Sequence, residues 1–323
     1  MTAIVDVRDL SRHFTVRRKE PGRLLRRRSE VVAVDAMTFS VQPGESVGYI
    51  GANGAGKSTT IKMLTGILVP TSGHVRTCGM EPLKQRKRLA RRVGVVFGQR
   101  TQLWWDLPVG ESFQILSAIH RMEPPAAVRR IDELVDQLEM GSYLGSPVRQ
   151  LSLGQRMRAE IAASLLHSPD LLILDEPTIG LDVLSKQRLR EFLRAERRDK
   201  GITLLLTTHD VGDVERLCDR VLLVDHGRLA FDGTLTGLAA TVGARRELVL
   251  DLAEPSPDLT AIPGSTHLGS EGDGMRQRLS FDAAETTVVA LLGEVSRHAE
   301  VLDVTVAEPD IEDVLSRIYA ATR

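Results

Sequence analysis

The strongest constraint in this sequence is a glycine-rich segment placed between a predicted strand and a predicted helix. The segment, GANGAGKST from Gly51 to Thr59, follows the apolar run 46–50 and precedes a helical pattern that continues to Leu64. A strand, a tight turn and a helix in this order begin a crossover unit, which predicts an α/β fold with a mostly parallel sheet. The spacing also satisfies the pattern G-x-x-x-x-G-K-[ST], whose backbone N–H groups surround phosphate.

The residues of this loop have separate predicted roles. The glycines let backbone N–H groups turn inward, and the N-terminus of the following helix adds positive potential. Lys57 is expected to reach the β and γ phosphates, and the Ser58 hydroxyl to ligate Mg²⁺. The full set expected to contact the nucleotide here comprises Gly51, Asn53, Gly54, Ala55, Gly56, Lys57, Ser58 and Thr59. A glycine turn without a nucleotide is the alternative, which the flanking strand and helix disfavour.

Two continuous apolar runs, 171–174 and 202–206, predict central strands that are buried on both faces. The first is followed by Asp175 and Glu176, and the second is followed by TTHD, which contains His209. Ligands bind at the carboxyl ends of strands in open α/β sheets, so we expect these side chains to converge on the glycine-rich loop. Asp175 is expected to hold Mg²⁺ and Glu176 to orient or deprotonate an attacking water, although an isolated acidic pair is more often a cap or a turn.

Histidines and cysteines elsewhere in the chain predict no further site. A lone histidine is more often structural than functional, which is our interpretation of His13, His74, His120 and His226. Cys78 and Cys218 are far apart and lack the spacing of metal ligands, which fits a reducing cytosol. The net charge of −1 gives no global attraction to nucleic acid or to an anionic membrane.

The remaining segments indicate how the chain is organised. Runs 3–7 and 31–41 predict antiparallel strands, and the basic stretch 17–28 between them is either a phosphate- or membrane-binding loop or a solvated one. Residues 108–168 show helical periodicity, and there the Ser152 hydroxyl is placed to cap a helix. No window approaches the ~18 to 20 consecutive apolar residues of a membrane span, so we expect a cytoplasmic protein.

Taken in order, these motifs resemble those of the ATP-binding cassette (ABC) ATPases. GANGAGKST looks like the Walker A loop, LSLGQ the ABC signature, LLILDEP the Walker B strand, GLD the D-loop and TTHD the switch histidine. The resemblance covers residues 3–235, and motifs in series are far more specific than any one of them. It implies ATP and Mg²⁺ as cofactors, with Glu176, His209 and Gln99 in catalysis and Ser58, Gln99 and Asp175 at the metal.

The resemblance also implies an architecture. We expect a P-loop NTPase fold of the ABC ATPase type, with an antiparallel β subdomain and a helical signature subdomain at about 108–168. The nucleotide-binding domain should span 1–238, and a small α+β accessory domain should span 239–323. Phe14 stands where the family places an aromatic ring against adenine.

Two such domains are implied to meet head to tail, so the chain needs a second copy or a paralogue. Each ATP would then lie between the Walker A loop of one subunit and Ser152, Gly154 and Gln155 of the other, and the D-loop residue Asp182 is also expected to contact the nucleotide. In this chain Leu153 replaces the first glycine of the usual LSGGQ signature, which leaves the predicted cap and Gly154 unchanged.

The partner implied by the resemblance is a separate membrane permease. Trp104 and Trp105 fall where the family receives a coupling helix, although tryptophans packed inside the helical insertion are the alternative. The layout resembles drug-exporter subunits, which would place the chain at the inner face of the cell membrane. An importer subunit, a soluble ABC ATPase acting on ribosomes or nucleic acid, and a non-hydrolysing scaffold are the alternatives. The chain has one cassette and no long coiled coil, so we expect no nucleic-acid partner.

Overall fold

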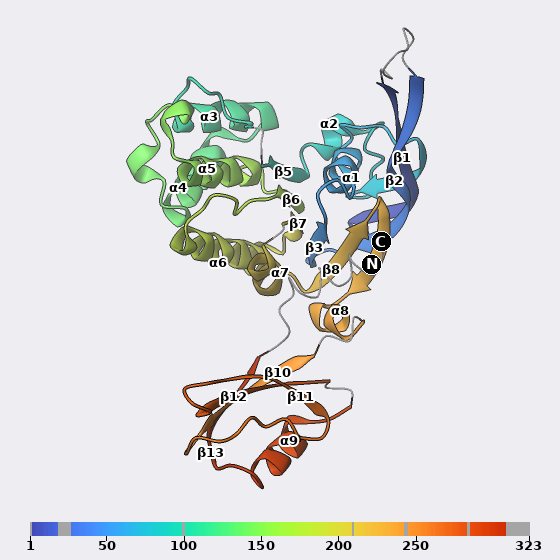
Figure 1. The fold of residues 1–323 in the computed structure, drawn as a ribbon. Helices are drawn as coiled ribbons and strands as arrows, with labels where there is room; N and C mark the ends of the chain where they lie inside the picture. Colours follow the sequence, from blue (N-terminus) through green and yellow to red (C-terminus); the bar gives the residue numbers. More distant parts are fainter. Residues whose placement is uncertain are drawn as a thin grey trace. The chain divides into compact units, whose positions relative to one another are not determined.

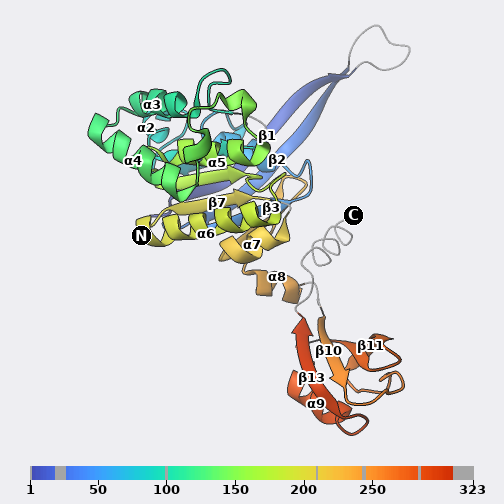
Figure 2. The same cartoon turned by 90° about the vertical axis from the view of Figure 1, so that its left-hand side faces the viewer.

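The computed structural model describes residues 2–18, 27–98, 101–208, 210–241, 245–282 and 285–307. The chain forms two compact units, residues 1–234 and residues 235–323. Figures 1 and 2 show the fold from two directions. In the described residues, no helix is long and apolar enough to cross a lipid bilayer.

A six-stranded sheet in the order β5-β6-β7-β3-β8-β9 forms the centre of the first unit. Its strands are β3 (Ser46–Gly51), β5 (Val93–Phe97), β6 (Leu171–Asp175), β7 (Thr203–Thr207), β8 (Arg220–Asp225) and β9 (Arg228–Gly233). All neighbouring pairs are parallel except β8 and β9. Strand β7 is buried along its whole length, as expected for an apolar strand covered on both faces. The predicted α/β fold with a mostly parallel sheet is confirmed.

A second, antiparallel sheet of the first unit has the order β2-β1-β4. Strands β1 (Val5–Arg18) and β2 (Arg27–Val41) form a long ribbon, visible in Figure 2, and β4 (Ser72–Thr77) pairs with β1. Both long strands exceed their predicted bounds and take in the two ends of the basic stretch 17–28. The middle of that stretch, residues 19–26, lies outside the described residues.

The helical insertion contains α3 (Val109–His120), α4 (Pro124–Gln137) and α5 (Leu153–Leu165), which lie together in Figure 1. Pro124 and Pro125 form the first turn of α4, where a missing N–H costs nothing. The other helices of this unit are α1 (Lys57–Leu64), α2 (Arg86–Leu89), α6 (Val183–Lys200) and α7 (Val211–Leu217), with 3-10 turns at Gly141–Tyr143 and Val148–Gln150.

The second unit begins with α8 (Leu235–Thr241) and contains an antiparallel sheet in the order β11-β12-β10-β13. Its elements are β10 (Arg246–Leu252), β11 (Ser265–Glu271), β12 (Arg276–Phe281), α9 (Val288–Val295) and β13 (Val301–Ala307). Its buried core lies between the sheet and α9 and includes Leu250, Phe281 and Leu291. Strand β11 escaped prediction because STHLGSE has no apolar alternation.

Candidate functional site

The glycine-rich loop joins the end of β3 to the start of α1. Gly54 and Gly56 have φ values of 86° and 102°, a region that side chains with a Cβ rarely adopt. A Cβ at Gly56 would collide with the carbonyl oxygen of Ala33, and one at Gly51 with that of Val224. The loop therefore needs its glycines both for its turns and for close packing against neighbouring backbone.

A cavity of about 520 Å³ opens beside this loop. It is lined by Ala33, Asn53, Gly54, Gly56, Lys57, Ser58, Thr59, Lys62, Ile67, Phe97, Gly98, Asp175, Glu176 and Ile179. Six of the residues expected to contact phosphate and both predicted carboxylates thus share one cavity. Gly51 and the buried Ala55 belong to the same loop without lining the cavity.

The two carboxylates are positioned by the neighbouring strand β7. The Thr207 hydroxyl donates a hydrogen bond of 2.5 Å to Asp175 Oδ1, and the Glu176 N–H donates one of 2.9 Å to the Thr207 carbonyl oxygen. Glu176 has φ 55°, an uncommon backbone conformation for a residue other than glycine. Such strain is held only where the surroundings enforce it, as they do at the ends of two buried strands.

Lys57 is the basic group of the phosphate-binding loop. Its Nζ donates to the carbonyl oxygens of Gly51 and Ala52 at 2.6 and 3.2 Å. Burial lowers the pKa of Lys57, and the negative charges of Glu176 and Asp175 partly offset that shift. The cavity therefore combines backbone donors and an ammonium group on one side with two carboxylates on the other, which suits an anionic ligand accompanied by a cation.

Comparison with known proteins decides which family has this site. Residues 34–179 match the family described as ABC transporter. The chain is 32% identical over 235 residues to the ABC transporter ATP-binding protein NatA of Bacillus subtilis, covering 73% of this chain and 91% of the relative. The chain belongs to the ATP-binding subunits of ABC transporters. It is therefore an ATPase, and ATP is its nucleotide.

Other relatives agree with this assignment. The linearmycin resistance ATP-binding protein LnrL of Bacillus subtilis is 30% identical over 90% of this chain and 94% of its own length. The Nod factor export ATP-binding protein I of Paraburkholderia xenovorans is 38% identical over 71% of this chain and 74% of its own length. A solved structure, described as the ATP binding subunit of an ABC transporter, is 29% identical with a TM-score of 0.64, covering 75% of this chain and 94% of that one.

The signature residue Ser152 and the D-loop residue Asp182 of this ABC ATPase cap helices and do not line the cavity. The Ser152 hydroxyl accepts from Gln155 N at 3.2 Å, and Gln155 Oε1 accepts from Ser152 N at 2.9 Å, which confirms the predicted cap and completes a capping box. Asp182 caps α6 by accepting from Ser185 N at 2.9 Å. Ser152 and Asp182 are exposed, and Gly154 and Gln155 are half-buried.

Gln99 and His209 lie outside the described residues. Phe14 is half-buried on β1, opposite Val31 of β2, with the Arg12 guanidinium 4.6 Å from its ring centre, and it is not among the cavity residues.

Sequence reasoning missed several cavity residues: Ala33, Lys62, Ile67, Phe97, Gly98 and Ile179. The sequence could have indicated Phe97 and Gly98 as cavity residues, because they directly precede the predicted Gln99. No sequence pattern could have indicated Ala33, because it lies on β2, in the other sheet of this unit.

Proposed function

We propose that this ABC ATPase powers export through a separate permease and works as one half of a head-to-tail dimer. The proposal depends on one observation: the Walker motifs of this chain line the cavity, and its signature and D-loop residues do not. The Walker A and Walker B residues share one cavity, whereas Ser152 and Asp182 are exposed and do not line it. A second subunit would complete the site by adding its own signature motif to this nucleotide.

In this proposal, hydrolysis is assigned to the cavity residues. Glu176 deprotonates or orients the attacking water, and Lys57 with the loop N–H groups holds the β and γ phosphates. Asp175 and Ser58 offer the hard oxygen ligands that suit Mg²⁺. When bound there, the ion would neutralise negative charge on the phosphates. Gln99 and His209 are proposed to assist Glu176 and the metal, and Phe14 to contact adenine.

The surface around the D-loop supports pairing with another subunit. Ile179, Val183 and Leu184 are 46%, 84% and 56% exposed, and Leu153 of the signature is 39% exposed. Neighbouring exposed apolar side chains indicate a surface that another protein covers. We assign this surface to a second ATPase subunit, most simply a second copy.

Export and the permease are supported by the relatives and by the tryptophan pair. Two relatives are named for Nod factor export and for linearmycin resistance. Trp104 and Trp105 are 37% and 48% exposed, which is unusual for such large apolar side chains and suits docking of a permease. The chain would then be cytoplasmic and peripheral to the membrane, with residues 1–238 as nucleotide-binding domain and 239–323 as accessory domain.

The proposed assignment is tested with Glu176→Gln. We expect ATP binding to persist, turnover to fall by a factor on the order of 10² to 10⁴ through loss of the base, and a dimer to accumulate with ATP on size-exclusion chromatography. Glu215→Gln changes an exposed carboxylate on α7 and should leave turnover unchanged. Rapid hydrolysis by Glu176→Gln would remove Glu176 from the role of base.

Permease docking is tested with the double variant Trp104→Ala, Trp105→Ala. We expect it to lose the permease in co-purification while it retains ATP hydrolysis. Ile119→Ala, which removes an exposed apolar side chain of the same helical insertion, serves as control. Recovery of an intact complex with coupled transport would rule out docking at the tryptophans.

A further inference from the structure

Asp213, on α7, is a fully buried carboxylate outside the nucleotide cavity. Its Oδ2 accepts hydrogen bonds from the hydroxyls of Thr178 and Thr208, the latter at 3.3 Å. Its Oδ1 accepts from Arg190 Nε at 2.7 Å, and Arg190 is itself only 8% exposed. One carboxylate therefore joins the turn after β6, the end of β7 and helix α6.

The same arginine reaches the loop that follows β7. Arg190 Nη2 lies 3.5 Å from Asp210 Oδ1, and Lys186 Nζ donates to Asp210 Oδ2 at 2.5 Å. The Asp210 N–H donates to the Thr208 hydroxyl at 2.9 Å. Asp210 is thus held by two charged side chains of α6, and Thr208 is held by Asp213 of α7.

This polar cluster is directly connected to the cavity carboxylates. Thr178 follows Glu176 by two residues, with Pro177 between them, whose ring fixes φ and limits the freedom of the link. Thr208 follows Thr207, which bonds Asp175 through its hydroxyl and Glu176 through its carbonyl oxygen. A shift of Thr178 or Thr208 would therefore move the carboxylates relative to the phosphate-binding loop.

We propose that Asp213 and Arg190 are positioning residues for ATP hydrolysis, which set the turn of Glu176 against the end of β7. The inference rests on the proposed role of Glu176 as the base. A buried ion pair costs desolvation and adds little net stability, whereas a small misplacement of a catalytic group strongly lowers the rate. The phosphate-binding residues are carried by β3 and α1, so loss of the cluster should alter turnover rather than nucleotide binding.

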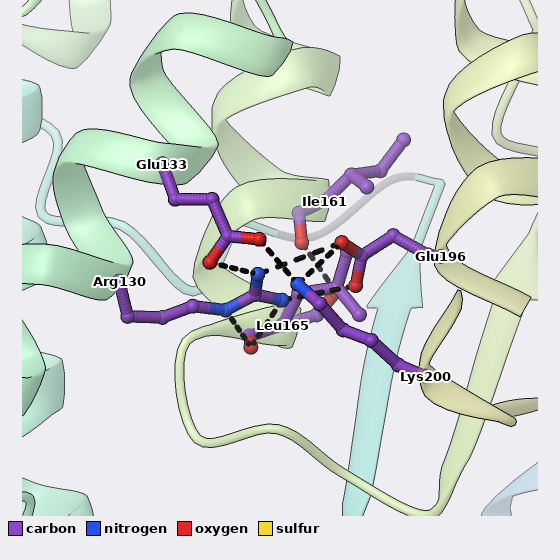
Figure 3. A network of polar contacts seen from close by, with 7 residues as sticks. Arg130, Glu133, Ile161, Leu165, Glu196 and Lys200 are labelled. Carbon is purple, nitrogen blue, oxygen red and sulfur yellow. Dashed lines mark hydrogen bonds and ion pairs between the residues drawn. The ribbon is translucent and has the colours of Figure 1, made fainter.

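The chain offers a matched control on the same helix. Glu196 of α6 is 3% exposed and bonds the buried Arg130 of α4 at 3.0 Å, in the network of Figure 3. Asp213→Asn and Glu196→Gln therefore make the same change, neutralising a buried carboxylate that is paired with a buried arginine. Only the first of these carboxylates is connected to the Glu176 turn by the bonds described above.

The experiment measures steady-state ATP hydrolysis against ATP concentration, and thermal unfolding, for the full-length variants. For Asp213→Asn we expect kcat to fall by a factor on the order of 10², with KM for ATP within about twofold of the parent protein. Glu196→Gln should lower the melting temperature and keep kcat. If Asp213→Asn keeps the parent kcat while Glu176→Gln loses hydrolysis, the inference is wrong and the proposed site stands. If both variants hydrolyse normally, the site assignment fails as well.

Thr178→Val provides a second variant should Asp213→Asn not fold. It keeps the shape of the side chain and removes one hydroxyl that bonds Asp213. We expect kcat to fall with KM retained, and Thr178→Ser, which restores the hydroxyl, to recover kcat. Parent-like kcat in a folded Thr178→Val protein would overturn the positioning role.

Discussion

Lys57 lies where burial and charge act on one ammonium group in opposite directions. Burial favours its neutral form, while Glu176 and Asp175 favour the charged form. The ammonium donates to two loop carbonyl oxygens, and these bonds fix its position against the phosphate-binding loop. Lys57 therefore bonds the backbone of the loop and also lines the cavity beside it.

Lys57→Ala should abolish measurable ATP turnover. Hydrogen bonds to charged groups contribute about 1.5 to 3 kcal/mol, so ATP affinity should fall by at least about tenfold. Isothermal titration with ATP measures this loss. Lys84→Ala, which removes an exposed lysine paired with Glu81, should bind ATP normally. Parent-like affinity in Lys57→Ala would contradict the loop assignment.

A second prediction at this scale concerns a pair of stacked histidines. The rings of His120 and His167 are 3.9 Å apart, and His167 Nδ1 is buried without a described partner. Burial and the neighbouring His120 lower the pKa of His167 from 6.5 to about 4. The unfolded chain therefore binds the proton more readily than the folded chain between these two pH values.

The stability that neutral His167 contributes is complete above pH 6.5 and is lost as the pH falls toward about 4. One pKa unit corresponds to about 1.4 kcal/mol, so the loss should be on the order of 3 kcal/mol. Denaturant unfolding at several pH values measures it. His167→Gln should flatten this part of the pH profile, while His226→Gln, at an exposed histidine, should not. An unchanged profile in His167→Gln would contradict the prediction.

At the scale of elements, a buried ion network joins α4, α5 and α6 (Figure 3). Arg130 of α4 donates to the carbonyl oxygen of Leu165, the last residue of α5, and pairs with Glu196 of α6. Lys200 and Glu133 extend the network on its solvent side. The network fastens the helical insertion to a helix of the α/β core.

Glu196→Ala should therefore destabilise the first unit. Removal of one partner leaves the Arg130 charge buried and uncompensated, which typically costs about 3 to 5 kcal/mol. Chemical denaturation measures the free energy of unfolding. Asp199→Ala removes an exposed carboxylate three residues along α6, beside Arg198, and should leave stability unchanged. Equal stabilities of the two variants would show that the network does not hold the insertion.

At the scale of the whole molecule, each unit has its own hydrophobic core. The two large cores of the first unit draw on buried residues between Ile4 and Val224, and the core of the second unit on residues between Leu248 and Val295. No buried residue belongs to both sets within the described chain. Each unit thus carries the apolar burial that independent folding requires.

Fragment 1–234 should fold and bind ATP with the affinity of the full chain. The cavity residues all lie between Ala33 and Ile179, inside this fragment. Circular dichroism and ATP titration test the prediction, and fragment 235–323 should show its own cooperative unfolding. A fragment 1–234 that cannot bind ATP would show that the second unit is needed for the site.

The sequence by itself determined the features that depend on neighbouring residues. The phosphate-binding loop, the buried strands β6 and β7 and the Ser152 cap were all predicted, because glycine spacing, continuous apolar runs and capping residues act within a few positions. The order of these motifs then indicated the family before any distance was known.

Only the tertiary structure decided which distant segments meet. It brought Ala33 from the antiparallel sheet to the cavity, bonded Asp213 to Thr178 and Arg190, and paired Arg130 with Glu196. The sequence does not distinguish a charged residue that will be buried from one that will be exposed, because burial and the choice of partner depend on tertiary packing. Contacts between residues far apart in the chain depend on the arrangement of whole sheets and helices, which no local pattern encodes.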